Sequence, residues 1–386
     1  MGDTGETRSF NNRVMNEPIP IIRPDIAIGD LEDDIKDILE TGILTSGKYV
    51  AEFEESVASW VGVEHGIATS SATTALHLSL SALGVGPGDE VMLSDFTYPA
   101  TANVVVQTGA TPVFVDSGTD DLSMDPEHAR ALVGEKTRVI MPVDPLGQPA
   151  DHASLEQLGS EADIAVVVDA ACALGASRDG RRSGSHGDMG CFSFHPRKVV
   201  TCGEGGMVTT GDPDLADRLR LLRNHGARKA STRAFEFVEP GFNYRLSEIP
   251  AALGISQMRR IEEILSDRRA TATRYDTEVS ALSGVQVLSP PPDVHWTYQS
   301  YVILIDESIE RDQVISRMSQ EGIETTIGTY ACHQHPAFSK WGYRPGDLPN
   351  SGRFADTTLT LPLVPRMTNS QIERVVETLS SILSSF

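Results

Sequence analysis

The chain has 386 residues, of which 40% are hydrophobic and 22% charged, values typical of a globular protein with a sizeable core. The formal net charge of −22 argues against nucleic acids and anionic membrane surfaces as partners. The four cysteines lack metal-type spacing, the apolar runs stay below the ~18 residues of a membrane span, and Met1–Asn12 lacks the apolar core of a signal peptide. We therefore expect a soluble, cytoplasmic protein with reduced thiols, no metal ion and no membrane contact.

The first quarter of the chain predicts an arm, two helices and a strand–turn–helix unit. Residues 1–23 form the arm, and helices follow at 30–39 and 49–60 on either side of a turn at 45–47. A strand at 66–69 then leads through a hydroxyl-rich turn into a helix at 75–83, which ends at a glycine-rich stretch.

Strands and helices alternate through the rest of the chain. Strands are predicted at 90–93, 111–115, 138–143 and 164–169, with helices at 128–133 and 153–158. A helical region at 246–282 precedes a strand at 301–305 and helices at 311–321 and 370–383. This order predicts an α/β fold with a mainly parallel sheet covered by helices. We divide the chain into an arm (1–23), a large domain (24–262) and a smaller C-terminal α+β domain (263–386).

Lys198 lies in an unusual stretch between Gly190 and Gly206. Two aromatic residues, a serine, a histidine and Pro196 precede it, and a glycine-dense turn follows, so it lies on irregular backbone. A lysine partly withdrawn from water in such surroundings is a nucleophile towards aldehydes and forms Schiff bases. At this point a surface loop lysine remains the alternative.

A hydroxyl-rich turn at 70–73 predicts an anion site. Hydroxyl groups beside the free N–H groups of a helix start bind phosphate, although simple capping of the helix is the alternative. Ser193, five residues before Lys198, is placed to add another hydroxyl.

Asp169 ends the apolar strand 164–169, at the edge where ligands bind in parallel sheets. A buried carboxylate there needs a cationic partner such as a protonated pyridine nitrogen, unless it only caps a helix. Tyr98 follows another strand and is suited to stack on a flat ring, or only to pack. A phosphate cradle, a stacking ring, a carboxylate and an activated lysine are the groups that a pyridoxal phosphate (PLP) site requires.

From Pro18 onward, the chain resembles the DegT/DnrJ/EryC1/StrS family, which are fold-type I aminotransferases acting on nucleotide-linked keto-sugars. The most specific segments are Phe192–Lys198 with Gly203–Gly206, and Gly241–Leu246. The other matching segments are Leu44–Gly47, Ser70–His77, Phe96–Asn103, Asp169–Ala171, Arg223–Gly226 and Leu361–Leu363.

The resemblance implies roles for individual residues. Lys198 is similar to the lysine that forms the internal aldimine, and Asp169 to the aspartate that pairs with the pyridine nitrogen. Tyr98 falls where the family has an aromatic residue against the ring. Three residues fall at phosphate-binding positions, namely Ala72, Thr73 and Ser193. Asn243 matches an asparagine that reaches the phosphate of the neighbouring subunit, which implies a homodimer whose active site is completed across the interface.

The chain departs from the family pattern at three places. Ala72 replaces a usual glycine, and Cys172 stands where a glutamine or histidine commonly contacts the cofactor. Asp144 and Pro145 replace the usual His-Leu of a strand-end motif. Relatives with histidine at the lysine position are dehydratases, and Lys198 argues against that branch.

The implied reaction is an amino transfer from L-glutamate or glutamine to a keto-sugar, through PLP and pyridoxamine phosphate (PMP) in two half-reactions. For the acceptor we expect a nucleotide-linked 4-keto or 3-keto deoxysugar. The candidate acceptor contacts are Thr45, His333, Arg245 and His225, with a hydrogen-bonded loop histidine as the alternative for His333. A keto-cyclitol acceptor, and a PLP-binding regulatory protein without turnover, remain the alternative functions.

Overall fold

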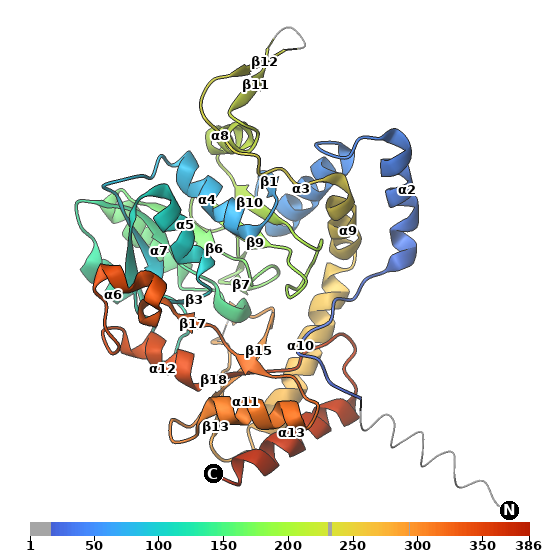
Figure 1. Ribbon diagram of the computed structural model, residues 1–386, viewed down its shortest axis with the longest axis vertical. Helices are drawn as coiled ribbons and strands as arrows, with labels where there is room; N and C mark the ends of the chain where they lie inside the picture. Colours follow the sequence, from blue (N-terminus) through green and yellow to red (C-terminus); the bar gives the residue numbers. More distant parts are fainter. Residues whose placement is uncertain (1–16, 231–233, 293) are drawn as a thin grey trace, which may run out of the picture.

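The computed structural model describes residues 17–230, 234–292 and 294–386, and so leaves most of the predicted arm outside the described residues. The centre of the molecule is a seven-stranded sheet in the order β1-β10-β9-β6-β5-β2-β4 (Figure 1). Its strands are β1 (His65–Thr69), β2 (Glu90–Ser94), β4 (Thr111–Val115), β5 (Thr137–Met141), β6 (Ala165–Asp169), β9 (Met189–Ser193) and β10 (Gly206–Thr210). β10 runs antiparallel to both of its neighbours, β1 and β9, and the other neighbouring strands of the sheet are parallel.

Helices cover both faces of this sheet, because successive side chains of its strands point to opposite faces. Val167 of β6 joins one hydrophobic cluster, whereas Val166 and Val168 join the other. One face is covered mainly by α4 (Ala72–Ala82), α5 (Ala100–Thr108) and α8 (Pro213–Arg223). The other is covered mainly by α3 (Lys48–Val61), α6 (Pro126–Leu132), α7 (His152–Ala162) and α9 (Glu248–Met258).

A smaller α+β unit lies below the large sheet in Figure 1. Its four-stranded sheet has the order β13-β15-β18-β16, and helices α10, α11 and α13 pack on it. The bounds are β13 (Val285–Val287), β15 (Tyr301–Ile305), β16 (Thr326–Ile327), β18 (Thr358–Leu361), α10 (Ile261–Val279), α11 (Arg311–Gln320) and α13 (Asn369–Leu383). Ile19, near the end of the predicted arm, is buried in the hydrophobic cluster of this unit.

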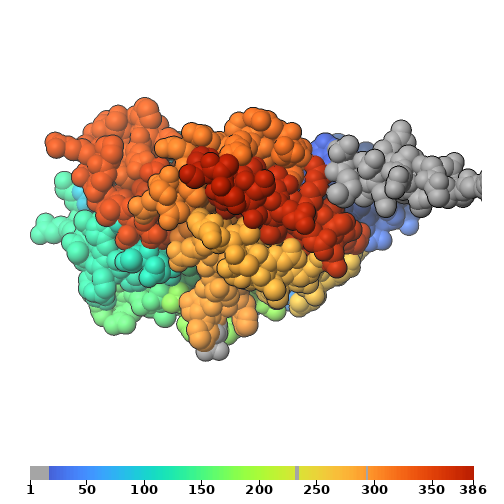
Figure 2. Space-filling model, turned by 90° about the horizontal axis from the view of Figure 1, so that it is seen from below, coloured from blue at the N-terminus to red at the C-terminus, as the bar shows by residue number. Residues whose placement is uncertain are grey.

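The C-terminal third also sends a segment back to the large sheet. β17 (Tyr330–Ala331) pairs with β3 (Phe96–Thr97), and α12 (Pro349–Thr357) follows. Cys332, Phe338 and Leu348 are buried in the same hydrophobic cluster as α4 and α5. Seen from below, the orange and red C-terminal third spreads over much of the molecule (Figure 2). We therefore propose that residues 330–348 belong with the large domain, although they follow the proposed boundary at 262.

The predicted α/β fold is confirmed, and the strands at 111–115 and 301–305 agree residue for residue. α4 begins three residues before the predicted start, because Ser71 and Thr74 form a reciprocal capping box that extends the helix. The helical region at 246–282 is divided into α9 and α10 around Arg259 and Arg260. Among the elements not predicted are the helices α5, α8 and α12, the strands β9 and β10 that flank the Lys198 loop, the strand β18, and a hairpin of β11 (Ala227–Lys229) and β12 (Phe235–Phe237).

Candidate active site

Four neighbouring parallel strands each lead into a buried aspartate. In sheet order these are Asp169 on β6, Asp144 after β5, Asp95 after β2 and Asp116 after β4. Because the strands are parallel, all four carboxylates lie along the same edge of the sheet, where parallel sheets bind ligands. What distinguishes the four is the group that each carboxylate contacts.

Asp169 has two hydrogen bonds with its carboxylate. Thr101 Oγ1, in the first turn of α5, donates to Oδ2 at 2.7 Å, and the backbone N–H of Ala171 donates to Oδ1 at 3.1 Å. Burial raises the pKa of Asp169, and these two bonds together with the nearby Lys198 charge only partly oppose that rise. The carboxylate is thus buried without a cation in direct contact among the described residues, so a cationic ligand would stabilise its charged form.

Lys198 lies on the loop between β9 and β10, and its side chain is half-buried. Its Nζ atom donates to Sγ of Cys172 at 3.0 Å. Cys172 follows the end of β6 by three residues, so this contact brings the lysine to the strand that carries Asp169. Of the predicted site residues, the structure therefore brings Lys198, Cys172 and Asp169 into one neighbourhood.

The start of α4 forms a cradle with Gly206. A Cβ atom added to Gly206 would lie 2.3 Å from the carbonyl oxygen of Ser71 and 2.7 Å from N of Ala72, so only glycine fits. Ser193 pairs with Gly206 across β9 and β10 and so flanks the same helix start. Ala72 and Thr73 are the first two helical residues, whose N–H groups lack an acceptor inside the helix. Ala72 needs no glycine-like backbone there, because it is helical.

Tyr98 is exposed and belongs to a group of aromatic side chains at the edge of the site. Its ring centroid lies 6.2 Å from that of Tyr330, which in turn lies 5.3 Å from the ring of His335. The hydroxyl of Thr101 lies 3.3 Å from the carbonyl oxygen of Tyr98 as well as contacting Asp169. The tyrosine is therefore adjacent to the Asp169 region, with an open face towards solvent.

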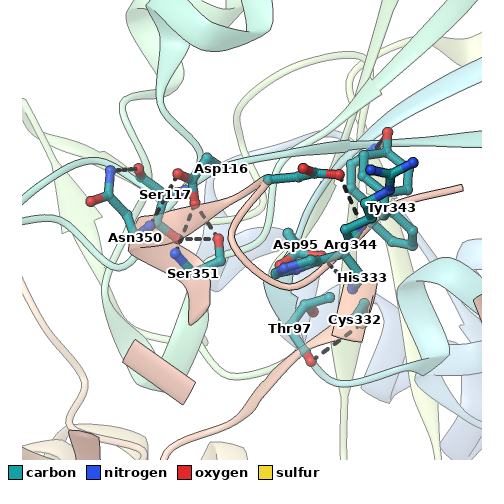
Figure 3. A network of polar contacts seen from close by, with 12 residues as sticks. Asp95, Thr97, Asp116, Ser117, Cys332, His333, Tyr343, Arg344, Asn350 and Ser351 are labelled. Atoms are coloured by element: carbon teal, nitrogen blue, oxygen red, sulfur yellow. Dashed lines mark hydrogen bonds and ion pairs between the residues drawn. The ribbon is translucent and has the colours of Figure 1, made fainter. Parts of the chain in front are cut away.

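Two of the strand-end aspartates hold the returning C-terminal segment (Figure 3). Asp95 accepts from the backbone N–H of His333 at 2.7 Å, and its other oxygen lies 2.6 Å from Nδ1 of the same residue. Asp116 accepts from the N–H groups of Asn350 at 3.1 Å and of Ser351 at 2.7 Å. The side chains of Asp95 and His333 are both 0% exposed. This geometry favours the alternative for His333, a hydrogen-bonded loop histidine, over a contact to the acceptor.

Asp144, the remaining strand-end aspartate, contacts a buried histidine of the large domain. Nε2 of His152 lies 3.0 Å from its Oδ1, and the His152 ring stacks on that of His186 with centroids 4.3 Å apart. Burial would raise the pKa of Asp144, but His152 and the N–H of Ala150 outweigh burial and lower it. The unusual aspartate of the strand-end motif is thus paired with a buried histidine.

The segment 243–248 connects several predicted substrate contacts. Arg245 forms a β-bridge with Thr69 beside the cradle, and its Nη1 donates to Oδ1 of Asn224 at 2.5 Å. Asn243 forms a bridge with Asn224, next to the exposed His225. Thr45 is exposed and forms a bridge with Ser247. These residues thus form one connected layer beside the start of α4.

Comparison with known proteins identifies the family. The family model described as DegT/DnrJ/EryC1/StrS aminotransferase matches residues 27–380. The chain belongs to this family. It is 37% identical over 387 residues to UDP-4-amino-4-deoxy-L-arabinose–oxoglutarate aminotransferase of Shewanella sediminis, with 96% of this chain and 99% of the relative covered. It is 36% identical over 360 residues to GDP-perosamine synthase of Caulobacter vibrioides, with 92% and 96% covered.

A solved structure agrees with this assignment. The putative sugar aminotransferase Spr1654 of Streptococcus pneumoniae, in its PMP form, superposes with a TM-score of 0.90 at 29% identity, covering 95% of this chain and 98% of that one. Membership makes the protein a PLP-dependent aminotransferase of a sugar aminotransferase family. In the described residues, no group of three or more acidic, histidine or cysteine side chains is arranged to bind a metal ion. None of the described helices has the length and hydrophobicity needed to cross a membrane.

Two further residues, Thr101 and Glu248, were not among the predicted site residues. Thr101 lies four residues after Thr97, and their hydroxyls are 3.0 Å apart at the start of α5. A threonine pair at this spacing near a helix start is a signal that could have found it. Glu248 gives no local signal, because its contacts lie about two hundred positions earlier in the chain.

Proposed function

We propose that this aminotransferase moves an amino group from L-glutamate or glutamine to a nucleotide-linked keto-sugar, a 4-keto or 3-keto deoxysugar. The observation that carries the proposal is the neighbourhood of the half-buried Lys198 and the buried Asp169, in a chain whose relatives are sugar aminotransferases. A lysine amine and a carboxylate without a cation in direct contact among the described residues are the two protein groups that PLP chemistry needs.

The residues fit the cofactor in charge and chemistry. Gly206 packs closely against the backbone of Ser71 and Ala72, and the helix N–H groups at Ala72 and Thr73 favour negative charge. We infer that these groups and Ser193 would hold the phosphate, that Asp169 would hold the ring nitrogen, and that Tyr98 would lie against the ring. Bound PLP supplies the carbonyl carbon that carries the amine and a ring that accepts electrons.

The chemical work of the protein then falls on two side chains. Nζ of Lys198, freed when an amino donor binds, would take the proton from the donor α-carbon as a general base and later return it as a general acid. Asp169 would keep a proton on the ring nitrogen, and Thr101 would orient the Asp169 carboxylate through its 2.7 Å hydrogen bond. Cys172, in contact with Nζ, would limit where the freed amine can swing.

The relatives support the substrate class. One is named for a UDP-linked 4-amino sugar and oxoglutarate, the keto acid that remains when glutamate loses its amine. The other is named for a GDP-linked product. Both names pair a nucleotide with a sugar, so a nucleotide-linked acceptor is the form we propose, with Thr45, Arg245 and His225 as its candidate contacts.

We also propose a homodimer. The β11–β12 hairpin stands away from the body of the molecule (Figure 1). Phe235 and Phe237 on it are 59% and 69% exposed, and Val238 beside them is also exposed. Ile43, Leu44 and Ile249 form a second group of exposed apolar side chains. Such surface is costly in water, so we expect a second copy of the chain to cover it, in line with the role across the interface that the resemblance implies for Asn243. A cytoplasmic location stays a prediction.

The deciding experiment compares wild type with Lys198→Ala by absorbance and turnover. Wild-type protein with PLP should change its absorbance when L-glutamate is added, and keto-sugar nucleotides should reverse the change. Lys198→Ala should lose at least ~10³-fold in turnover, because general acid/base and covalent roles are both removed. Near-wild-type activity would refute the role of Lys198. A wild-type absorbance change that only keto-cyclitols reverse would refute the acceptor, and no change with either donor would favour a regulatory protein.

A further inference from the structure

Glu248 is a buried carboxylate, 1% exposed, at the start of α9. Its side chain crosses to the start of α3 and accepts three backbone N–H groups. Oε1 accepts from Gly47 at 2.8 Å and Val50 at 3.3 Å, and Oε2 accepts from Tyr49 at 3.0 Å. A carboxylate is well suited to this position, since the N–H groups at a helix start carry partial positive charge.

These bonds fix the turn that presents Thr45. The backbone N–H of Glu248 also donates to the carbonyl oxygen of Leu44 at 3.0 Å, and Thr45 forms a β-bridge with Ser247. Ser46 has a φ of +56°, a left-handed conformation that non-glycine residues adopt only when their surroundings hold them there. The turn is therefore held from both ends by one residue of α9.

Gly47 allows the carboxylate to approach this closely. A Cβ atom added to it would lie 2.6 Å from Oε2 of Glu248 and 2.8 Å from Cγ2 of Ile43. Its φ of −102° is open to any residue, so glycine is required by the contact and not by backbone conformation. An alanine here would displace the carboxylate without straining the backbone.

We propose that Glu248 is a positioning residue for the acceptor, which it serves by holding the Thr45 turn in place. This inference rests on the proposed function, in which Thr45 contacts the keto-sugar nucleotide. Segment 243–248 also forms a bridge with Thr69, next to the cradle for the phosphate. Glu248 thereby fixes the acceptor side of the site relative to the cofactor side.

Glu248→Gln tests the proposal while keeping the size of the side chain. The amide has one acceptor oxygen, so at least one of the three N–H groups would face an NH₂ group instead. We expect KM for the keto-sugar nucleotide to rise about tenfold, the size of one charge-assisted hydrogen bond, with kcat changed less than about twofold. KM for the amino donor and the affinity for PLP should also stay within about twofold. An unchanged acceptor KM would overturn the proposal.

Gly47→Ala gives a second test through the same contact, with the same expected split between KM and kcat. Asp212→Asn is the matched control, since Asp212 also accepts two N–H groups at a helix start, that of α8. It follows the end of β10 that is opposite to the Gly206 cradle. This control should lower the melting temperature slightly and leave the acceptor KM unchanged. A rise in acceptor KM with the control would mean that any lost helix cap produces the effect.

Hydrogen exchange separates failure of this inference from failure of the proposed function. In Glu248→Gln the amides of Gly47, Tyr49 and Val50 should exchange at least about tenfold faster, while those of α8 stay as in wild type. If wild-type protein aminates no keto-sugar nucleotide, the proposed function fails, and faster exchange at these amides would still support the positioning of the turn by Glu248. Unchanged exchange would overturn that positioning whichever substrate is used.

Discussion

Buried aspartates at the carboxyl ends of neighbouring strands differ in what they contact. Asp169, at the β6 end, is held by one hydroxyl and one N–H group, with no cation in direct contact among the described residues. Asp95 and Asp116, which follow β2 and β4, are hydrogen-bonded to a segment that returns from the C-terminal third. The first is available to a ligand, whereas the other two hold the protein together.

The comparison shows that position at a strand end does not decide the role of a carboxylate. All four aspartates are buried, so each loses hydration and needs compensation. Burial raises the pKa of Asp95 as well as that of Asp169, so the difference lies in the direct partners. Where the protein supplies a histidine side chain, as His333 does for Asp95, the pair stabilises the fold. Where it supplies no such partner, a cationic ligand can take that place, and a change at that residue should affect catalysis more than folding.

The largest effect is expected for Asp169→Asn. An amide cannot hold a positive ring nitrogen as a carboxylate does, so turnover should fall ~10²–10³-fold. The free energy of unfolding without cofactor should change by less than about 1 kcal/mol, because a poorly compensated buried charge is removed. Turnover assays check the predicted loss of activity, and urea unfolding checks the free energy of unfolding. Strong destabilisation with normal turnover would contradict the proposed difference between Asp169 and the pair of Asp95 and Asp116.

The opposite pattern is expected for His333→Ala. Removing the histidine leaves Asp95 buried with one backbone N–H and opens a cavity, so the free energy of unfolding should fall by about 3 kcal/mol. Since the His333 side chain is fully buried, the folded fraction should keep kcat within about threefold. His335→Ala is the control, a half-buried residue two positions away that should cost less than ~0.5 kcal/mol. Equal stability of the two variants would contradict the role of the Asp95–His333 pair.

The smallest expected effect concerns Asp144 and its histidines. Burial, together with the nearby His152 and Arg181, lowers the pKa of His186 from 6.5 to about 4, while Glu156 and Asp144 oppose this shift. Because the unfolded chain then binds a proton that the folded one does not, stability should fall as the pH drops from about 6.5 to about 4. Urea unfolding at these two pH values measures the loss in the free energy of unfolding, and His186→Gln should make that loss smaller by ~1–2 kcal/mol. An unchanged pH dependence of the free energy of unfolding would show that His186 does not titrate in this way.

The sequence carried the information for the fold in its local periodicity. Strands such as 111–115 and 301–305 are short, apolar and bounded by turns, and these signals need no distant partner. Lys198 and Asp169 could also be predicted, because the irregular loop of one and the strand end of the other are local features. Since β6 and β9 are adjacent and parallel, the loop after β9 places Lys198 in contact with Cys172, close to Asp169.

What the sequence could not supply is the identity of distant partners. His333 lies 238 positions from Asp95, and Glu248 lies 201 positions from Gly47. A histidine near the acceptor and a histidine paired with a buried carboxylate have the same local surroundings in sequence. The interpretation of His333 as an acceptor contact therefore depended on resemblance, and the packing of the returning segment favours the other alternative.

The returning segment has a consequence for protein engineering. Because residues 330–348 are buried against the large sheet, the chain crosses between its two structural units more than once. A chimera that takes its C-terminal part from a relative with a single junction near 262 would combine one parent's Asp95 and Asp116 with the other parent's docking residues. Junctions placed before Tyr330 and after α12 as well would keep each carboxylate with the partners that evolved beside it.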